Sequence, residues 1–248
     1  MNLARGCNDA TGRGAKILKP DPIGLCFSMP LAFTLKSMTI HQNQTVLTRG
    51  TPLDKARLAM IMVHGRGASA EDILSLSAGL PQDGVAYLAP QAADHIWYPN
   101  RFLAPVASNE PYLSSALDTL DALVKRIVAQ GLATEKILLL GFSQGASLML
   151  EYVARHATRY GGVAGLSGAM IENGDQPREY TGSLDATPVF LGCSDTDMFI
   201  PAQRVLQSET RLRELGASVT ARLYPNMDHT INEDELAYVS EMVKQVGK

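Results

Sequence analysis

The stretch that decides the fold is Ile137-Leu138-Leu139-Leu140-Gly141-Phe142-Ser143-Gln144-Gly145-Ala146-Ser147-Leu148-Met149-Leu150. Its four consecutive apolar residues, 137–140, are typical of a strand that is buried on both faces in a parallel sheet. A Gly-x-Ser-x-Gly sequence follows, and apolar residues then recur at the density of a buried helix. The stretch therefore predicts a strand that turns abruptly into a helix, with Ser143 at the tip of the turn.

The two glycines of this motif, Gly141 and Gly145, have a mechanical role. A turn this sharp strains the backbone of the serine, and side chains two positions to either side would collide with neighbouring backbone. The turn exposes the serine oxygen at the C-terminal edge of the sheet, where backbone N–H groups point at whatever the oxygen attacks. We predict that Ser143 is a nucleophile. The alternative is a glycine-rich turn that only closes a buried strand.

The rest of the chain alternates between strand and helix patterns. Apolar runs predict strands at 58–63, 85–89, 163–166, 188–192 and 219–224, and helices are predicted from Ala70, over 113–128, from 144 to about 156, over 201–215 and from 233 onward. This alternation predicts an α/β fold in which a mostly parallel central sheet carries helices on both faces. Residues 91–111 are rich in Pro, Asn and aromatic residues without a regular period, which predicts a long loop of the kind that is usually functional.

The composition limits the classes of function. With 248 residues, 46% hydrophobic and 19% charged, the chain can build one substantial core. A net charge of −3 gives no electrostatic reason to expect nucleic acid or an anionic membrane as a partner. No run reaches the roughly 18 apolar residues that a membrane span needs. The three cysteines are odd in number and widely spaced, which predicts neither a disulfide framework nor a metal site and favours the cytoplasm.

Residues 1–37 differ from the rest of the chain. Scattered basic residues precede an apolar patch, Ile23 to Leu35, that is interrupted by Pro30. A secretory signal has this order, but the apolar part is short and lacks a small-x-small cleavage site. We predict a poorly packed leader at 1–37 and a catalytic domain at 38–248, with Met38 as a possible functional start.

A serine hydroxyl is a weak nucleophile, so it needs a base, and the base needs an orienting acid. In α/β sheets of this kind the three groups follow in the order serine, acid, histidine, each on a loop after a strand. Only His156 and His229 lie beyond Ser143. His156 sits far along the helix that begins at the serine and is predicted to be a surface residue, whereas His229 follows the last strand. We predict His229 as the base.

The acid is less well determined by spacing. The strand at 189–192 leads directly to Asp195 and Asp197, which both lie on the required loop. Spacing alone does not choose between them, nor does it exclude Asp175, Asp185 or Asp228. The acid would hold His229 in the correct tautomer and stabilise the imidazolium that forms during attack.

Attack of a serine on a carbonyl gives a tetrahedral intermediate with a developing negative oxygen, which needs two preorganised N–H donors. Gln144, directly after the serine, is predicted to supply one through its backbone. The turn Gly65-Arg66-Gly67, which follows the strand at 58–63, allows a close approach of backbone, so we predict the N–H of Arg66 as the second. The alternative is a flexible turn whose arginine is merely solvated.

Taken together, residues 50–248 resemble the carboxylesterase/phospholipase family of α/β hydrolases, which includes acyl-protein thioesterases. His64-Gly65-x-Gly67 resembles the oxyanion turn of that family, and Gly141-Phe142-Ser143-Gln144-Gly145 matches its elbow. Asp195-x-Asp197-x-x-Ile200-Pro201 resembles its acid loop, and this pattern selects Asp197 as the catalytic acid. Trp97-Tyr98-Pro99 with Asn109 resembles its loop over the substrate.

The resemblance implies an α/β-hydrolase fold and a serine hydrolase that acts on carboxylic esters through an acyl-enzyme, without metal or cofactor. We predict short- to medium-chain acyl esters as its substrates. Relatives are often monomers or homodimers. The sequence departs from the family pattern at Arg66, usually apolar, at Met198, usually proline, and at Asp228, usually glycine, so thioesterase specificity is not carried over. An apolar acyl pocket is predicted from Trp97, Phe102, Leu103, Met198 and Phe199.

Two other functions remain open at this point. The first is thioesterase or lysophospholipase activity on long acyl chains. The second belongs to a different class: a binding protein that keeps a hydrolase scaffold without turnover.

Overall fold

The computed structural model describes residues 40–174 and 178–247. The predicted leader at 1–37 lies outside the described residues, so the domain boundary at residue 38 stays a prediction.

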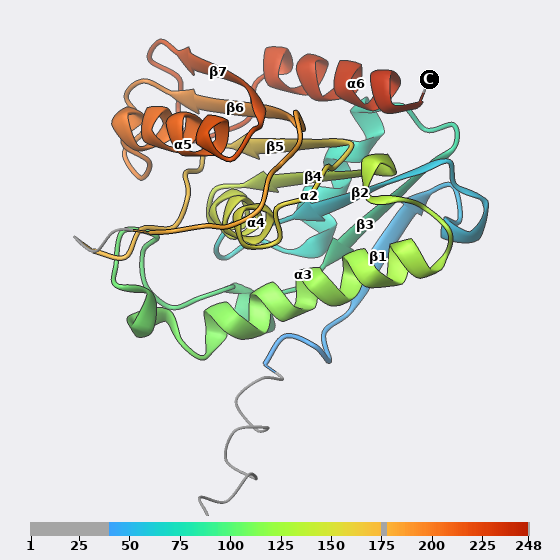
Figure 1. Cartoon of the computed structure of the whole chain (residues 1–248), viewed down its shortest axis with the longest axis horizontal. Coiled ribbons are helices and arrows are strands. Elements are labelled where there is room, and N and C mark those ends of the chain that lie inside the picture. Colours follow the sequence, from blue (N-terminus) through green and yellow to red (C-terminus); the bar gives the residue numbers. More distant parts are fainter. Residues whose placement is uncertain (1–39, 175–177, 248) are drawn as a thin grey trace, which may run out of the picture. The chain divides into compact units, whose positions relative to one another are not determined.

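A single sheet organises the described part of the chain, with seven strands in the order β1-β3-β2-β4-β5-β6-β7 (Figure 1). The strands are β1 (Val46–Gly50), β2 (Leu58–Val63), β3 (Val85–Pro90), β4 (Ile137–Phe142), β5 (Gly162–Leu166), β6 (Pro188–Ser194) and β7 (Ser218–Tyr224). Only β1 runs antiparallel, along β3, and the other pairs are parallel. The carboxyl ends of the parallel strands therefore share one edge, where the loops that carry polar residues meet.

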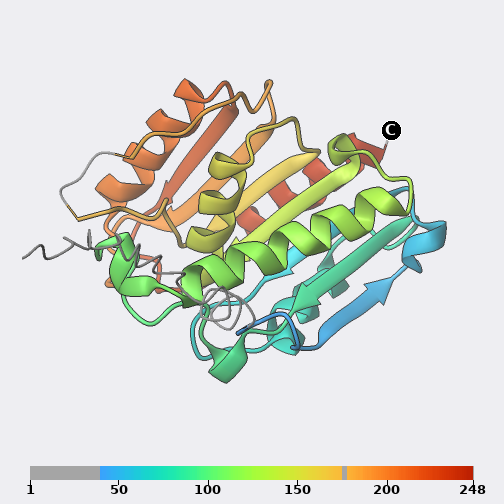
Figure 2. The same cartoon turned by 60° about the horizontal axis from the view of Figure 1, so that its bottom comes forward.

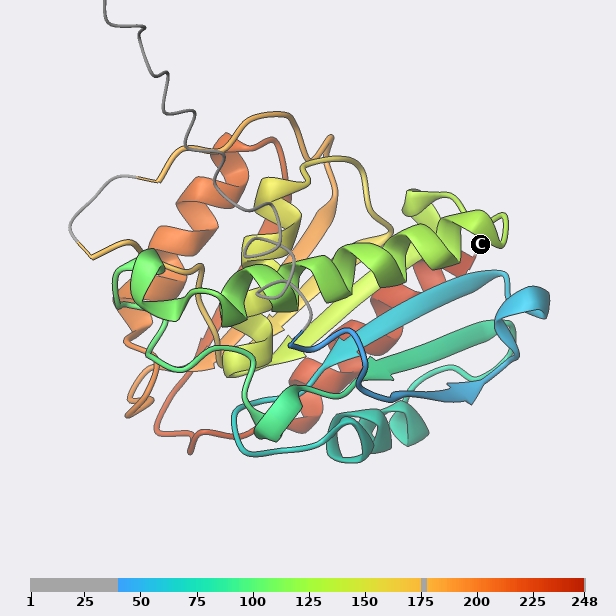
Figure 3. The same ribbon diagram turned by 90° about the horizontal axis from the view of Figure 1, so that it is seen from below.

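The helices cover both faces of this sheet. α3 (Tyr112–Ala129), α4 (Gln144–Arg155) and α5 (Ala202–Glu214) pack on one face, and α2 (Ala70–Ser75) and α6 (Glu233–Gly247) pack on the other. In Figures 2 and 3, α3 crosses in front of the sheet while the red helix α6 lies behind it. Short 3-10 helices lie in the connections: η1 (Leu53–Lys55), η2 (Leu76–Gly79), η3 (Ala93–His95), η4 (Val106–Asn109) and η5 (Thr134–Lys136).

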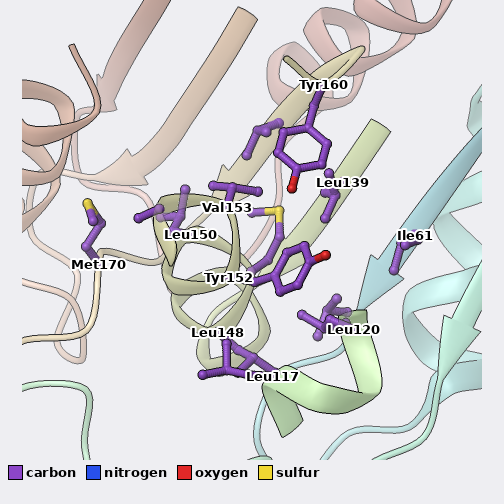
Figure 4. Close-up of a cluster of buried hydrophobic side chains, with 14 of the residues drawn as sticks. Ile61, Leu117, Leu120, Leu139, Leu148, Leu150, Tyr152, Val153, Tyr160 and Met170 are labelled. Carbon is purple, nitrogen blue, oxygen red and sulfur yellow. The ribbon is translucent and has the colours of Figure 1, made fainter. Parts of the chain in front are cut away.

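The alternation of side chains along the strands divides the core into two layers. In β2, Ile61 and Val63 face α3 and α4, whereas Met60 and Met62 face α2 and α6. The first layer is the larger one, and Figure 4 shows leucines of α3 and α4 packed with side chains of β2 and β4. Burial of each such aliphatic side chain contributes roughly 1.5–3 kcal/mol, so α4 is held firmly against the sheet.

The predicted α/β architecture is confirmed, and each predicted strand is present with ends that differ by at most two residues. The strand β1 was not predicted from the sequence. This edge strand is partly buried only at Val46 and Leu47, and its other three residues are exposed. It therefore lacks the apolar run that identifies the central strands.

Candidate active site

Ser143 stands at the turn between β4 and α4 in a strained conformation. Its φ is 53° and its ψ −119°, a region that costs a non-glycine residue on the order of 1–3 kcal/mol. The surroundings hold it there: its N–H donates to Leu166 O at 2.9 Å. A Cβ at Gly141 would lie 2.6 Å from the Cα of Ala146, and one at Gly145 would overlap with backbone carbonyls of β2 and its loop. The glycines thus permit the close approach predicted from the motif.

Three side chains from separate loops meet above the carboxyl edge of the sheet. The Oγ of Ser143 lies 2.9 Å from Nε2 of His229, which follows β7. The other ring nitrogen of His229, Nδ1, lies 2.7 Å from Oδ2 of Asp197, which follows β6. Because residues 143, 197 and 229 are far apart in sequence, only the parallel sheet with its common edge brings them together.

The side chain of Asp197 is buried, and both of its carboxylate oxygens accept hydrogen bonds. Its side chain is 0% exposed, and its Oδ1 accepts hydrogen bonds from the N–H groups of Phe199 at 2.8 Å and Ile200 at 3.0 Å. Burial acts to raise the pKa of the Asp197 carboxyl, but these hydrogen bonds and the contact with His229 outweigh it, so the pKa lies below its ordinary value. The carboxylate is therefore ionised at neutral pH. The nearby Cys193 stays neutral because burial raises the pKa of its thiol to about 12.

The other aspartates considered as the acid have different surroundings. Asp195 accepts a hydrogen bond from the N–H of Asn226 at 2.9 Å, which braces the loop of His229. Asp185 is exposed at a turn, and the backbone O of Asp228 accepts from the N–H of Thr230. Asp175 lies outside the described residues. His156 has 45% of its side chain exposed, at the far end of α4, as expected for a surface residue.

The turn at Gly65 and Arg66 packs against the elbow. A Cβ at Gly65 would meet the Cβ of Ser143 at 3.4 Å, which places the turn directly beside the serine. Within residues 40–174 and 178–247, the backbone N–H groups of Arg66 and Gln144 have no acceptor. Two preorganised donors with no protein acceptor are what an oxyanion hole requires.

The ring of His64 holds this turn through hydrogen bonds, a role that was not predicted from the sequence. The ring is buried, its Nδ1 donates to Gly65 O at 2.8 Å and its Nε2 accepts from the N–H of Ala92 at 3.1 Å. Burial lowers the pKa of His64, so the ring is neutral. It follows that His64 supports the backbone and does not serve as a proton carrier.

A pocket of about 460 Å³ opens beside Ser143. It is lined by Ser143 and His229, by the loop 98–102, by Phe199 and Ile200, and by Arg66, Gln144 and Ser147. Of the five residues predicted to form an acyl pocket, Phe102 and Phe199 line it. Trp97 is fully buried beneath the loop, Met198 is 79% exposed outside the pocket, and Leu103 packs against the core.

The loop over the site is held by side chains that bond to its backbone. The side chain of Gln144 accepts from the N–H of Trp97 at 2.9 Å and donates to Tyr98 O at 2.8 Å. Asn109 accepts from the N–H of Asn100 at 2.8 Å. The side chain of Arg66 donates from Nη2 to Tyr98 O at 2.8 Å and to Asn100 O at 2.9 Å. For Gln144 and Arg66, the sequence predicted roles of the backbone N–H groups but not these contacts of the side chains.

Among the described residues, no three His, Cys, Asp or Glu side chains are grouped so that they could hold a metal ion. No helix in the same part of the chain is long and apolar enough to span a membrane.

The pattern of the Phospholipase/Carboxylesterase family matches residues 49–246, which include every element of the site described above. The chain belongs to this family. The match confirms the resemblance drawn from the motifs and, with the sheet order, the α/β-hydrolase fold. The family comprises serine hydrolases, among them carboxylesterases and acyl-protein thioesterases.

Individual relatives agree with this assignment. A phospholipase/carboxylesterase from Dyadobacter fermentans has a crystal structure that is 40% identical, with a TM-score of 0.78, over 84% of this chain and 99% of that one. The acyl-protein thioesterase 1 of Debaryomyces hansenii is 28% identical over 78% of this chain and 93% of its own length. A probable carboxylesterase SOBER1-like from Arabidopsis thaliana is 29% identical over 55% of this chain, and the match spans only about half of that relative, 52%.

Proposed function

We propose that the protein is a serine carboxylesterase that acts on short- to medium-chain acyl esters through an acyl-enzyme. The observation that carries the proposal is the continuous pair of hydrogen bonds from Ser143 through His229 to Asp197, at 2.9 and 2.7 Å. This geometry is within the range that a nucleophile, its base and an orienting acid need.

The proposed reaction starts with proton transfer from Ser143 to Nε2 of His229 while the Oγ forms a bond to the ester carbonyl carbon. Asp197 stabilises the resulting imidazolium. The backbone N–H groups of Arg66 and Gln144 hold the oxyanion. As the intermediate collapses, the bond to the alcohol oxygen breaks and His229 returns the proton to it. A water molecule then repeats the sequence on the acyl-enzyme and releases the acid.

Replacement of the nucleophile tests this proposal directly. In a Ser143→Ala variant, the kcat of a model ester such as a butyrate should fall by roughly four to six orders of magnitude, while the thermal unfolding curve shifts little. A fluorophosphonate probe should label the unmodified protein once, and should not label the variant. Ser75→Ala, an exposed serine on α2, is the matched control and should keep both activity and labelling.

The outcomes separate the alternatives that the sequence left open. A folded Ser143→Ala variant with full activity would overturn the assignment of the nucleophile. Absence of both labelling and hydrolysis in the unmodified protein would support a binding protein on a hydrolase scaffold.

Long-chain activity is the second candidate, because Met198 and Phe199 present apolar surface, 79% and 51% exposed, beside the pocket. A series of aryl esters and acyl thioesters from two to sixteen carbons distinguishes the two substrate ranges. A kcat/KM that peaks at four to eight carbons supports the carboxylesterase, and a steady rise with chain length supports the thioesterase or lysophospholipase.

A further inference from the structure

Two arginines without an acidic partner face the same pocket. Within residues 40–174 and 178–247, eight arginines lie within 4.0 Å of a carboxylate. Four do not: Arg66, Arg101, Arg126 and Arg159. Arg66 and Arg101 both line the pocket that holds Ser143, although the two positions belong to different loops. Two of these four arginines therefore lie at the proposed site.

Both guanidinium groups are held in place by neutral acceptors. Nη2 of Arg66 is bound by two backbone carbonyls of the loop, and Nη2 of Arg101 donates to Phe199 O at 2.9 Å across the pocket. Carbonyl oxygens orient a guanidinium without neutralising it. In each arginine, Nη1 and Nε have no acceptor among the described residues, so a planar edge with donors remains for an anion.

No carboxylate offsets these charges at the pocket. None of its lining residues, all in the described part of the chain, is Asp or Glu. The nearest acid of the mechanism, Asp197, lies behind His229 with a side chain that is 0% exposed and already accepts hydrogen bonds from His229, Cys193 and two backbone N–H groups. A pocket lined by fixed charge of one sign raises the local concentration of ligands of the opposite sign.

We propose that this pocket selects esters that carry an anionic group, a carboxylate or a phosphate, which pairs with Arg101 and Arg66 while the ester carbonyl lies against Ser143. The inference rests on the proposed esterase function and names its substrate class. Arg101 binds the anion. Arg66 has two roles, since one of its nitrogens also ties the turn to the loop.

Pairs of esters that share the scissile ester group, and of which one member carries an anionic group, provide the test. Monomethyl succinate and dimethyl succinate share the same scissile methyl ester, and the first carries a carboxylate at pH 7. Butanoyl glycerol 3-phosphate and butanoyl glycerol form the corresponding phosphate pair. For at least one pair we expect the anionic ester to have a kcat/KM about tenfold higher or more, mainly through KM, and the ratio should decline at 0.5 M salt. The pair that shows the preference identifies the anion.

Variants assign the preference to particular residues. Arg101→Gln should reduce the ratio of anionic to neutral kcat/KM by about tenfold. Arg66→Gln should reduce this ratio and also lower turnover of the neutral ester, because the loop loses its bonds to the turn. Arg126→Gln is the matched control, since Arg126 is an exposed arginine on α3 that lacks a carboxylate partner and does not line the pocket.

The failure of this inference differs from the failure of the esterase proposal. If Ser143 is labelled and, in both pairs, the neutral ester has the same kcat/KM as the anionic one, the proposed selection by charge is wrong while the esterase proposal is unaffected. The same holds if Arg101→Gln and Arg126→Gln give equal ratios. If no ester is hydrolysed and no label is incorporated, the esterase proposal is overturned, and the substrate class with it.

Discussion

The elbow at Ser143 and the loop 97–102 form two walls of one pocket, and they are held by different means. The elbow is fixed by backbone packing, because its glycines touch backbone atoms of α4 and of the turn after β2. The loop has no regular structure beyond short turns and depends on the side chains of Gln144, Arg66 and Asn109. Close packing of backbone against backbone leaves no room for a residue larger than glycine. The hydrogen bond of a side chain, by contrast, can be removed by a substitution without a steric clash.

This difference predicts how each wall responds to mutation. A change at the elbow should act on the whole domain, since α4 and the central strands share its contacts. A change at the loop should leave the sheet and the contacts of Ser143, His229 and Asp197 in place and alter the shape of the pocket. Three substitutions test these expectations, in order of decreasing effect.

The largest effect is expected from Gly145→Ala. The added methyl group would overlap with the backbone oxygens of Val63 and His64, which belong to a buried strand end and cannot move independently. We expect a loss of about 3 kcal/mol or more in the free energy of unfolding, or failure to fold. Urea denaturation followed by the fluorescence of Trp97, the only tryptophan of the chain, measures the loss.

Gly79→Ala is the control for this experiment. Gly79 has no atom within 4 Å of an added Cβ and has no positive φ, so the substitution should change stability by less than about 1 kcal/mol. If the two variants are equally stable, the elbow accommodates an added methyl group as easily as a surface turn does. The proposed difference between the elbow and the loop 97–102 would then be wrong.

An intermediate effect is expected from Gln144→Leu, which removes the bonds to the loop and keeps the backbone N–H. The N–H of Trp97 then loses its buried partner, at about 1–3 kcal/mol before the loop relaxes, whereas the carbonyl of Tyr98 keeps its hydrogen bond from Arg66. We expect kcat/KM to fall by at most about tenfold. The fluorescence spectrum of Trp97 should shift to longer wavelength, and the fluorophosphonate probe should still label Ser143.

Gln130→Leu, an exposed glutamine that follows α3, serves as the control and should leave the spectrum and the rate unchanged. An unaltered spectrum in Gln144→Leu would show that the loop is held without this side chain.

The same difference explains what the sequence could predict. The central strands and the elbow are specified locally, by apolar runs and by glycines whose spacing is set by the turn, so their positions were predicted within two residues. The sequence also predicted which loops carry Ser143, Asp197 and His229, because chain order along a parallel sheet determines which loops share an edge. Spacing alone left Asp195 and three further aspartates as alternatives to Asp197, and it was the family pattern that selected Asp197. The tertiary contacts add what each residue does: Asp195 bonds to the loop of His229, and Asp197 contacts the histidine ring.

The loop wall was predicted less well, for a physical reason. An aromatic residue in a loop can face the pocket or the core, and nothing in its neighbours decides which. Trp97 turns inward and packs against the rings of His64 and His41, whereas Phe102 lines the pocket. The contacts of the Arg66 and Gln144 side chains likewise depend on segments more than 30 residues away.

The smallest effect is expected at the loop of His229. It tests whether this loop is held as firmly as the elbow or as loosely as the loop 97–102. The loop of His229 joins α6 through reciprocal bonds of Asn232 and Glu235, each 2.9 Å, but Oε1 of the buried Glu235 has no partner among the described residues. Burial raises the pKa of Glu235 to about 7, from an ordinary value of 4.5. The folded state therefore holds a proton that the unfolded state releases, and the free energy of unfolding should fall as the pH rises from about 4.5 to about 7.

Glu235→Gln removes this titration while it keeps an oxygen for Asn232. The stability of the variant relative to the unmodified protein should thus be about 1–2 kcal/mol more favourable at pH 8 than at pH 5. The comparison between the two proteins cancels the opposite slope from His41 and His64, whose pKa values are lowered by burial. Glu233→Gln, on the exposed side of the same helix turn, is the control, and urea midpoints at both pH values give the measurement. A difference that does not change with pH would mean that water reaches Glu235, and that the histidine loop is held as loosely as the loop 97–102.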